Sequence, residues 1–74
     1  MCIHHAPPDC VEHIIRRCMA ILKKSKGETN EEYLYWVEWL GEVMGDLPDS
    51  DWTRLRRLVE KNEQLNRDIF GRVL

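Results

Sequence analysis

The chain has 74 residues, of which 43% are hydrophobic and 32% are charged, and it carries a formal net charge of −2 at pH 7. This length allows one domain at most, and this balance of apolar and charged residues excludes a disordered chain. No apolar run approaches the roughly 20 residues that cross a bilayer, and the N-terminus lacks the pattern of a signal peptide, so the sequence predicts a cytoplasmic protein without membrane contacts.

The first eighteen residues hold every cysteine and histidine of the chain, and residues 1–8 are expected to form a flexible tail. The six residues are Cys2, His4, His5, Cys10, His13 and Cys18. Zinc is bound by four such side chains in a tetrahedron. The candidate ligands of one zinc ion are Cys2, His4, Cys10 and His13. Their spacing matches no zinc-finger pattern, so we expect no cofactor and keep a zinc-stabilised helical module as an alternative function.

Residues 9–26 are expected to form the first helix. Asp9 can accept hydrogen bonds from the free N–H groups at its start, and Gly27 is typical of the position just beyond a helix end. The apolar side chains of this segment recur at helical spacing, which places them on one face. They are Val11, Ile14, Ile15, Cys18, Ile21 and Leu22.

A capping box formed by Thr29 and Glu32 predicts a second helix over residues 30–44. At 100° per residue, its apolar side chains cover an arc of about 220° from Trp39 round to Leu34, much wider than the single stripe of a surface helix. A helix with so wide an apolar face must be covered by neighbours on two sides.

Residues 49–71 are expected to form a third helix, with Asp49 as its N-terminal cap. Asn62 falls in the middle of the apolar face of this segment. A buried Asn at such a position can fix the register and oligomeric state of paired helices. The alternative is that Asn62 bonds a backbone carbonyl or a water molecule within one chain. The apolar residues of this face are Trp52, Leu55, Leu58, Val59, Leu65, Ile69 and Phe70.

These segments predict an all-α fold with three helices in a single domain, residues 9–74. One possible arrangement is a compact three-helix bundle. The other is a helical hairpin of the second and third helices that forms a homodimer, with the N-terminal helix packed on its side. The wide apolar face of residues 30–44 favours the homodimer. Its expected interface consists of Trp36, Leu40, Leu55, Asn62, Leu65 and Ile69.

Acidic residues are concentrated in residues 28–51, which contain eight acidic side chains and no Lys or Arg, between two basic flanks. Aromatic residues lie among them, and aromatic side chains commonly anchor protein interfaces. Carboxylates around such anchors steer a partner that has a basic surface. The expected partner-binding residues are Tyr35, Glu38, Trp39 and Glu42. The alternative is that the aromatic residues pack in the core and the acids only neutralise the basic segments.

Three arginines, Arg54, Arg56 and Arg57, follow a short turn at the start of the third predicted helix, as in a helix-turn-helix DNA-binding protein. They point in different directions around the helix. The chain is also acidic, with a pI near 5.9, whereas DNA-binding domains are usually basic. A DNA-binding protein is therefore kept as an alternative function, and a nucleic-acid partner is not expected.

No paired carboxylates, phosphate-binding loop or nucleophile with a neighbouring base can be recognised in this sequence, so we do not expect an enzyme. In size and composition the chain resembles the small helical accessory proteins of bacteriophages and mobile elements. This resemblance implies a protein that sequesters a host regulator or enzyme. The expected function is that of a regulator or inhibitor, which binds a host or partner protein through its acidic and aromatic surface.

Overall fold

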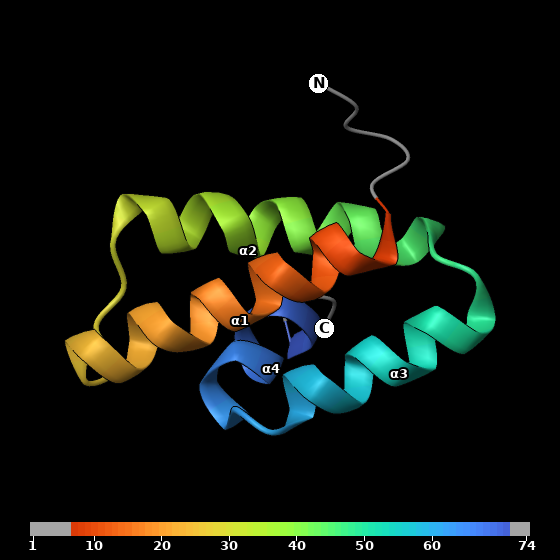
Figure 1. Cartoon of the computed structure of the whole chain (residues 1–74). Helices are drawn as coiled ribbons and strands as arrows, with labels where there is room; N and C mark the ends of the chain where they lie inside the picture. The colour runs from red at the N-terminus through yellow and green to blue at the C-terminus, as the bar shows by residue number, and fades with distance from the viewer. Residues whose placement is uncertain (1–6, 72–74) are drawn as a thin grey trace.

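The computed structural model describes residues 7–71, which form four α-helices and one 3-10 turn (Figure 1). The elements are α1 (Pro8–Ser25), α2 (Glu31–Val43), η1 (Met44–Asp46), α3 (Asp49–Glu60) and α4 (Glu63–Phe70). No strand occurs in residues 7–71, in agreement with the predicted all-α fold. The prediction of three helices is wrong, because residues 49–71 form two helices. Asp49 is the first residue of α3 rather than its cap, and most of the predicted tail, residues 1–6, lies outside the described residues.

The third predicted helix is interrupted at Asn62. The backbone of Asn62 has φ −122° and ψ 108°, which is extended rather than helical. Its side-chain Oδ1 accepts a hydrogen bond of 3.0 Å from the backbone N–H of Leu65, so Asn62 is the N-terminal cap of α4. Asparagine competes for backbone hydrogen bonds in this way, which favours it at helix starts over helix interiors. The side-chain oxygen of Asn62 is therefore used within one chain.

Replacing this cap should weaken the fold measurably. We expect Asn62→Ala to lower the free energy of unfolding by about 0.5–2 kcal/mol, because the N–H group of Leu65 loses its acceptor. Chemical denaturation followed by circular dichroism measures this difference. Asn62→Asp retains a capping oxygen and should stay close to the native protein. An Asn62→Ala variant as stable as the native protein would show that the cap contributes nothing.

The first helix begins one residue earlier than predicted, at Pro8, whose restricted φ suits the first turn of a helix. Asp9 is not the cap but lies in this turn, where its negative charge complements the helix dipole. At the other end, Lys26 and Gly27 both have positive φ angles, 57° and 92°. The N–H of Gly27 donates to the carbonyl oxygen of Leu22 over 2.8 Å, which closes the end of α1.

The cap of α2 is Asn30 rather than the predicted Thr29. The Oδ1 atom of Asn30 accepts a hydrogen bond of 2.7 Å from the backbone N–H of Tyr33. Glu32, the second member of the predicted capping box, instead accepts a hydrogen bond of 2.7 Å from the Nε of Arg17 on α1. The expected position of the helix start is thus nearly correct, but a neighbouring residue makes the capping bond.

The helices enclose one hydrophobic core. α2 packs against α1 and α4, and α3 packs against the same two helices, so the four form a ring in the order α1, α2, α4, α3. Most of the wide apolar face of α2 is therefore covered on two sides, as predicted, by helices of the same chain, whereas Leu34 at its edge is exposed. The core side chains are Val11, Ile14, Ile15, Cys18, Leu22, Tyr33, Val37, Leu40, Val43, Met44, Leu55, Val59, Leu65 and Ile69.

Four of the six residues expected at a homodimer interface are buried in this core. They are Leu40, Leu55, Leu65 and Ile69. Trp36 is half-buried against the core. Most of the apolar face that suggested a homodimer is thus covered within one chain. A homodimer stays a prediction, and its interface requires residues other than these four. Within residues 7–71, no helix has both the length and the apolar character needed to cross a membrane.

Candidate protein-binding surfaces

The outer side of α2 carries exposed acidic and apolar side chains together. Glu31, Tyr35, Glu38 and Glu42 are exposed and fall on one side of the helix at 100° per residue. Leu34 lies at the edge of this side. Tyr35 and Leu34 are 62% and 53% exposed, which is unusual among the large apolar side chains of residues 7–71. We call these five residues the acidic face of α2.

Two half-buried tryptophans support the acidic face. The ring of Tyr35 meets that of Trp36 edge-on, with 4.9 Å between centroids, and Trp36 meets Trp39 in the same manner at 5.6 Å. Both tryptophans pack against the core. The indole N–H of Trp36 also donates to Glu32 over 3.4 Å. The tryptophans therefore belong largely to the fold, and Trp36 also contacts the exposed Tyr35 ring.

The acidic side chains of residues 28–51 are mostly not neutralised by the basic segments. Of the eight acidic residues in residues 28–51, only Glu32 and Asp51 form an ion pair with another residue of 7–71. Glu32 pairs with Arg17, whose hydrogen bond holds the pKa of this carboxyl below its ordinary value. Simple neutralisation within the chain, the alternative considered for the sequence, therefore accounts for few of these charges.

The structure thus brings three of the four expected partner-binding residues together at the surface. Tyr35, Glu38 and Glu42 are fully part of the acidic face. Trp39 is half-buried at its margin, so only its outer part is accessible. Leu34 is not among the predicted partner-binding residues, although its apolar side chain marks one end of the predicted arc.

A shallow groove of about 570 Å³ runs along the junction of α2 and α4, next to the acidic face. Leu34 and Glu38 line one side of it, and Asp68 lies on the other side. Asp68 accepts a hydrogen bond of 2.5 Å from the hydroxyl of Tyr33, a buried residue of α2. Burial, together with this bond to Asp68, raises the pKa of Tyr33. The hydrogen bond between Tyr33 and Asp68 therefore connects the α4 side of this groove to α2.

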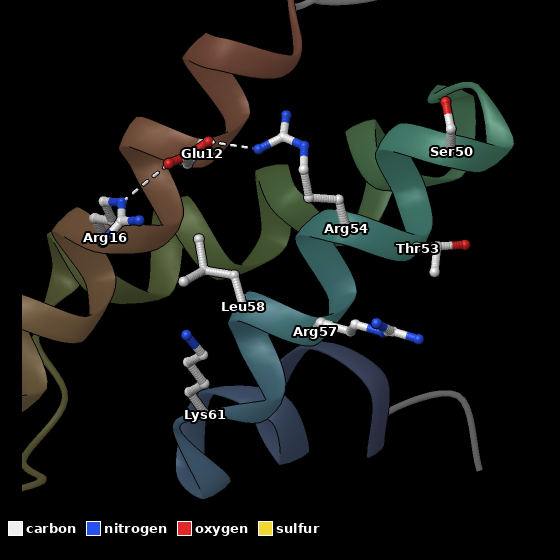
Figure 2. A pocket seen from close by; sticks show the side chains of 8 residues that line it. All are labelled: Glu12, Arg16, Ser50, Thr53, Arg54, Arg57, Leu58 and Lys61. Atoms are coloured by element: carbon white, nitrogen blue, oxygen red, sulfur yellow. Dashed lines mark hydrogen bonds and ion pairs between the residues drawn. The ribbon is translucent and has the colours of Figure 1, made fainter.

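A second groove, of about 550 Å³, lies between α1 and α3 (Figure 2). We call it the basic groove, because four basic side chains and one acidic side chain line it. Its lining residues are Glu12, Arg16, Ser50, Thr53, Arg54, Arg57, Leu58 and Lys61. This site is not expected from the sequence, because its basic residues come from two helices. The only signal in the sequence is the spacing of Arg54, Arg57 and Lys61, which places them on one side of α3 and its C-terminal cap.

Glu12 organises the basic groove from its α1 side. Figure 2 shows Arg16 and Arg54 directed at this carboxylate from opposite sides. The Nε of Arg16 donates to one oxygen over 3.1 Å, and the Nη1 of Arg54 donates to the other over 2.7 Å. The hydrogen bonds from Arg54 and then Arg16 lower the pKa of Glu12. One carboxylate therefore positions two guanidinium groups along the groove.

The three arginines of the helix-turn-helix hypothesis have separate roles in the structure. Arg56 lies over the rings of Trp52 and Phe70, 5.1 Å and 4.7 Å from their centroids, and so connects α3 to α4. Arg54 bonds Glu12, and Arg57 lines the basic groove. Only two of the three arginines therefore share a surface.

Two of the four candidate zinc ligands can be placed. Cys10 and His13 are both exposed on α1, whereas Cys2 and His4 lie outside the described residues. Among residues 7–71, no three Cys, His, Asp or Glu side chains are grouped so that they could hold a metal ion. Cys18 is buried in the core, as its place on the apolar face of α1 predicts. The expected absence of a cofactor and the alternative of a zinc site both stay untested.

Comparisons of the chain with models of protein families, with curated proteins and with solved structures found no match of any kind.

Proposed function

We propose that this chain is a small helical regulator or inhibitor, which acts by binding another protein through the acidic face of α2 and performs no catalysis. The observation that carries this proposal is the combination found there. Tyr35 and Leu34 are exposed, and the surrounding Glu31, Glu38 and Glu42 have no ion pair with any residue of 7–71. Exposed apolar anchors surrounded by unpaired charge are typical of recognition surfaces.

The chemistry of this face selects a partner with a basic surface. Three carboxylates at one side of a helix attract cationic residues over a Debye length of about 8 Å at physiological salt. Tyr35 supplies an apolar ring and a hydroxyl group, and its ring rests edge-on against Trp36. A nucleic-acid-binding groove or the dimer face of a regulator has the required basic character.

Charge reversal at two positions of the acidic face tests the proposal. We expect Glu38→Lys with Glu42→Lys to reduce binding of the partner about tenfold or more, because two attractions become repulsions. The protein is immobilised, a lysate of host cells is passed over it, and bound proteins are quantified by mass spectrometry. A specific partner is a protein that the native protein captures in larger amount than this variant does.

The control is Glu60→Lys with Glu63→Lys, which changes the net charge equally at exposed positions of α3 and α4 and also removes the ion pairs of these glutamates with Arg56 and Arg67. Circular dichroism should show that both variants remain folded. The proposal requires that the control retains the partner. Equal binding by the native protein and the Glu38→Lys, Glu42→Lys variant, or equal loss in both variants, would refute a specific role of this face.

A further inference from the structure

The two charged surfaces lie on opposite sides of the molecule. The ring order of the helices places α2 across from α3, and the basic groove lies where α3 meets α1. In Figure 2, which looks into the basic groove, α2 lies behind α1 and α3. One side of the protein is therefore acidic with exposed apolar residues, and the opposite side is a groove lined by cations.

The basic groove keeps a positive charge that the rest of residues 7–71 does not neutralise. Arg57 and Lys61 form no ion pair within these residues. Arg16 and Arg54 share the single carboxylate of Glu12, although Arg54 also approaches Asp51 at 3.8 Å. The groove can therefore accept additional carboxylates.

We propose that the basic groove receives the acidic face of α2 from a second copy of this chain. The two surfaces are complementary in charge, and the spacing of their charged residues is the same. Glu31 and Glu38 are seven residues apart on α2, and so are Arg54 of α3 and Lys61, the residue in helical conformation that caps its C-terminal end. At 1.5 Å per residue both separations are about 10 Å, so two ion pairs can form at once when the helices lie side by side.

The apolar residues match in the same alignment. Leu34 and Tyr35 lie midway between the two glutamates of α2, and the half-buried Leu58 lies midway between Arg54 and Lys61. Docking therefore places an exposed apolar pair against Leu58, the one apolar side chain that lines the groove. This is the arrangement by which an amphipathic helix binds a groove, with charged residues at the edges.

Because the two surfaces face in opposite directions, the contact is head-to-tail and leaves one surface free on each end copy. Its ion pairs are solvent-exposed, so the association should be weak and sensitive to salt. The second copy and the proposed partner compete for the acidic face of α2. Self-association requires the basic groove in addition to the acidic face of α2, so it can be absent while the proposed function holds.

Analytical ultracentrifugation of the full chain tests this inference. We expect the native protein to associate with rising concentration at roughly 20 mM salt and to become monomeric at roughly 500 mM salt, where the Debye length is about 4 Å. Two variants reverse one surface each. They are Arg57→Glu with Lys61→Glu, which makes the groove acidic, and Glu31→Lys with Glu38→Lys, which makes α2 basic.

Each variant alone should sediment as a monomer at low salt, because its two surfaces have the same sign. An equimolar mixture should associate again, because every contact between the two variants is then between opposite charges. The matched control is Lys23→Glu with Lys24→Glu, which changes the charge as much as the groove variant but outside the groove lining. This control should associate like the native protein. Thermal melting shows that each variant is folded.

Several results would overturn the inference. They are a native protein that stays monomeric at low salt, an association that survives either reversed surface, and a mixture that does not associate. Binding of duplex DNA or of a foreign acidic helix to the groove, without self-association, would assign another occupant. The groove variant keeps the acidic face of α2, so capture of a partner by this variant separates failure of the inference from failure of the proposed function.

Discussion

Leu55→Ala should lower the free energy of unfolding by about 2–5 kcal/mol, because the buried leucine leaves a cavity where the helices meet. Leu55 has no exposed surface in the single chain. A domain of this length has a total stability of roughly 4–11 kcal/mol, so this one change removes a large part of it. The expected result is a protein that is partly or fully unfolded at 37 °C.

The dependence of the denaturation midpoint on protein concentration shows whether Leu55 is buried within one chain or at a dimer interface. If Leu55 stabilises the single chain, the denaturation midpoint stays constant as the protein is diluted a hundredfold. If Leu55 instead belongs to an obligate dimer interface, the midpoint falls on dilution. The control is Leu34→Ala at a half-exposed position, which should change stability by less than about 0.5 kcal/mol. A loss below 1 kcal/mol for Leu55→Ala would contradict the described core.

Stability should also fall steeply above pH 9. Burial raises the pKa of the Cys18 thiol from 9.0 to about 11, and burial with the bond to Asp68 raises the pKa of Tyr33 above its ordinary 10.0. In the unfolded chain both groups lose their protons at the lower values, so deprotonation favours unfolding. Their contribution is complete below pH 9 and is lost as the pH rises.

The size of this loss of stability depends on the pH range between the pKa of each group in the unfolded chain and its pKa in the folded chain. Between pH 9 and 11, Cys18 alone should reduce stability by about 3 kcal/mol, at about 1.4 kcal/mol per pH unit. Tyr33 adds a similar slope above pH 10. Urea denaturation at a series of pH values, with a reductant present, measures the slope. Cys18→Ala should flatten it between pH 9 and 10, and Tyr33→Phe should flatten the part above pH 10.

Two controls test whether Cys18 and Tyr33 cause the loss of stability at alkaline pH. Below pH 8 the native protein should show no slope from these two groups, since both are protonated in the folded and unfolded states. The Cys10→Ala variant, which lacks the exposed thiol, should keep the full alkaline slope. An unchanged slope in Cys18→Ala would mean that the buried thiol does not cause the alkaline loss of stability.

Helix positions in the first half of the chain followed from apolar spacing, whereas the break before α4 did not. The spacing of Leu58, Asn62, Leu65 and Ile69 continues at three or four residues through the break. Periodicity therefore predicts one helix where there are two. The hydrogen bond of Asn62 to the backbone decides the matter, and it depends on a local competition that apolar spacing does not report.

The two charged surfaces also differed in how far the sequence predicts them. The acidic face of α2 could be predicted because its residues share one helix and their directions follow from 100° per residue. The basic groove could not be predicted, because Arg16 and Lys61 meet only when α1 and α3 pack together. The sequence also could not distinguish an apolar face covered by the same chain from one covered by a second chain. The residues are equally apolar in both cases, and Leu40 and Leu65 are covered by their own chain.

The short α4 has a consequence for how this protein unfolds. Its eight residues are too few to stay helical alone, since isolated helices below about 12–15 residues are marginal in water. α4 is helical because it is docked, through buried Leu65 and Ile69 and through the bonds of Gln64 to Gly27 and Asp68 to Tyr33. Its release costs less free energy than global unfolding. In hydrogen–deuterium exchange, the amides of α4 should therefore exchange through a partial opening, before those of α1 and the inner side of α2.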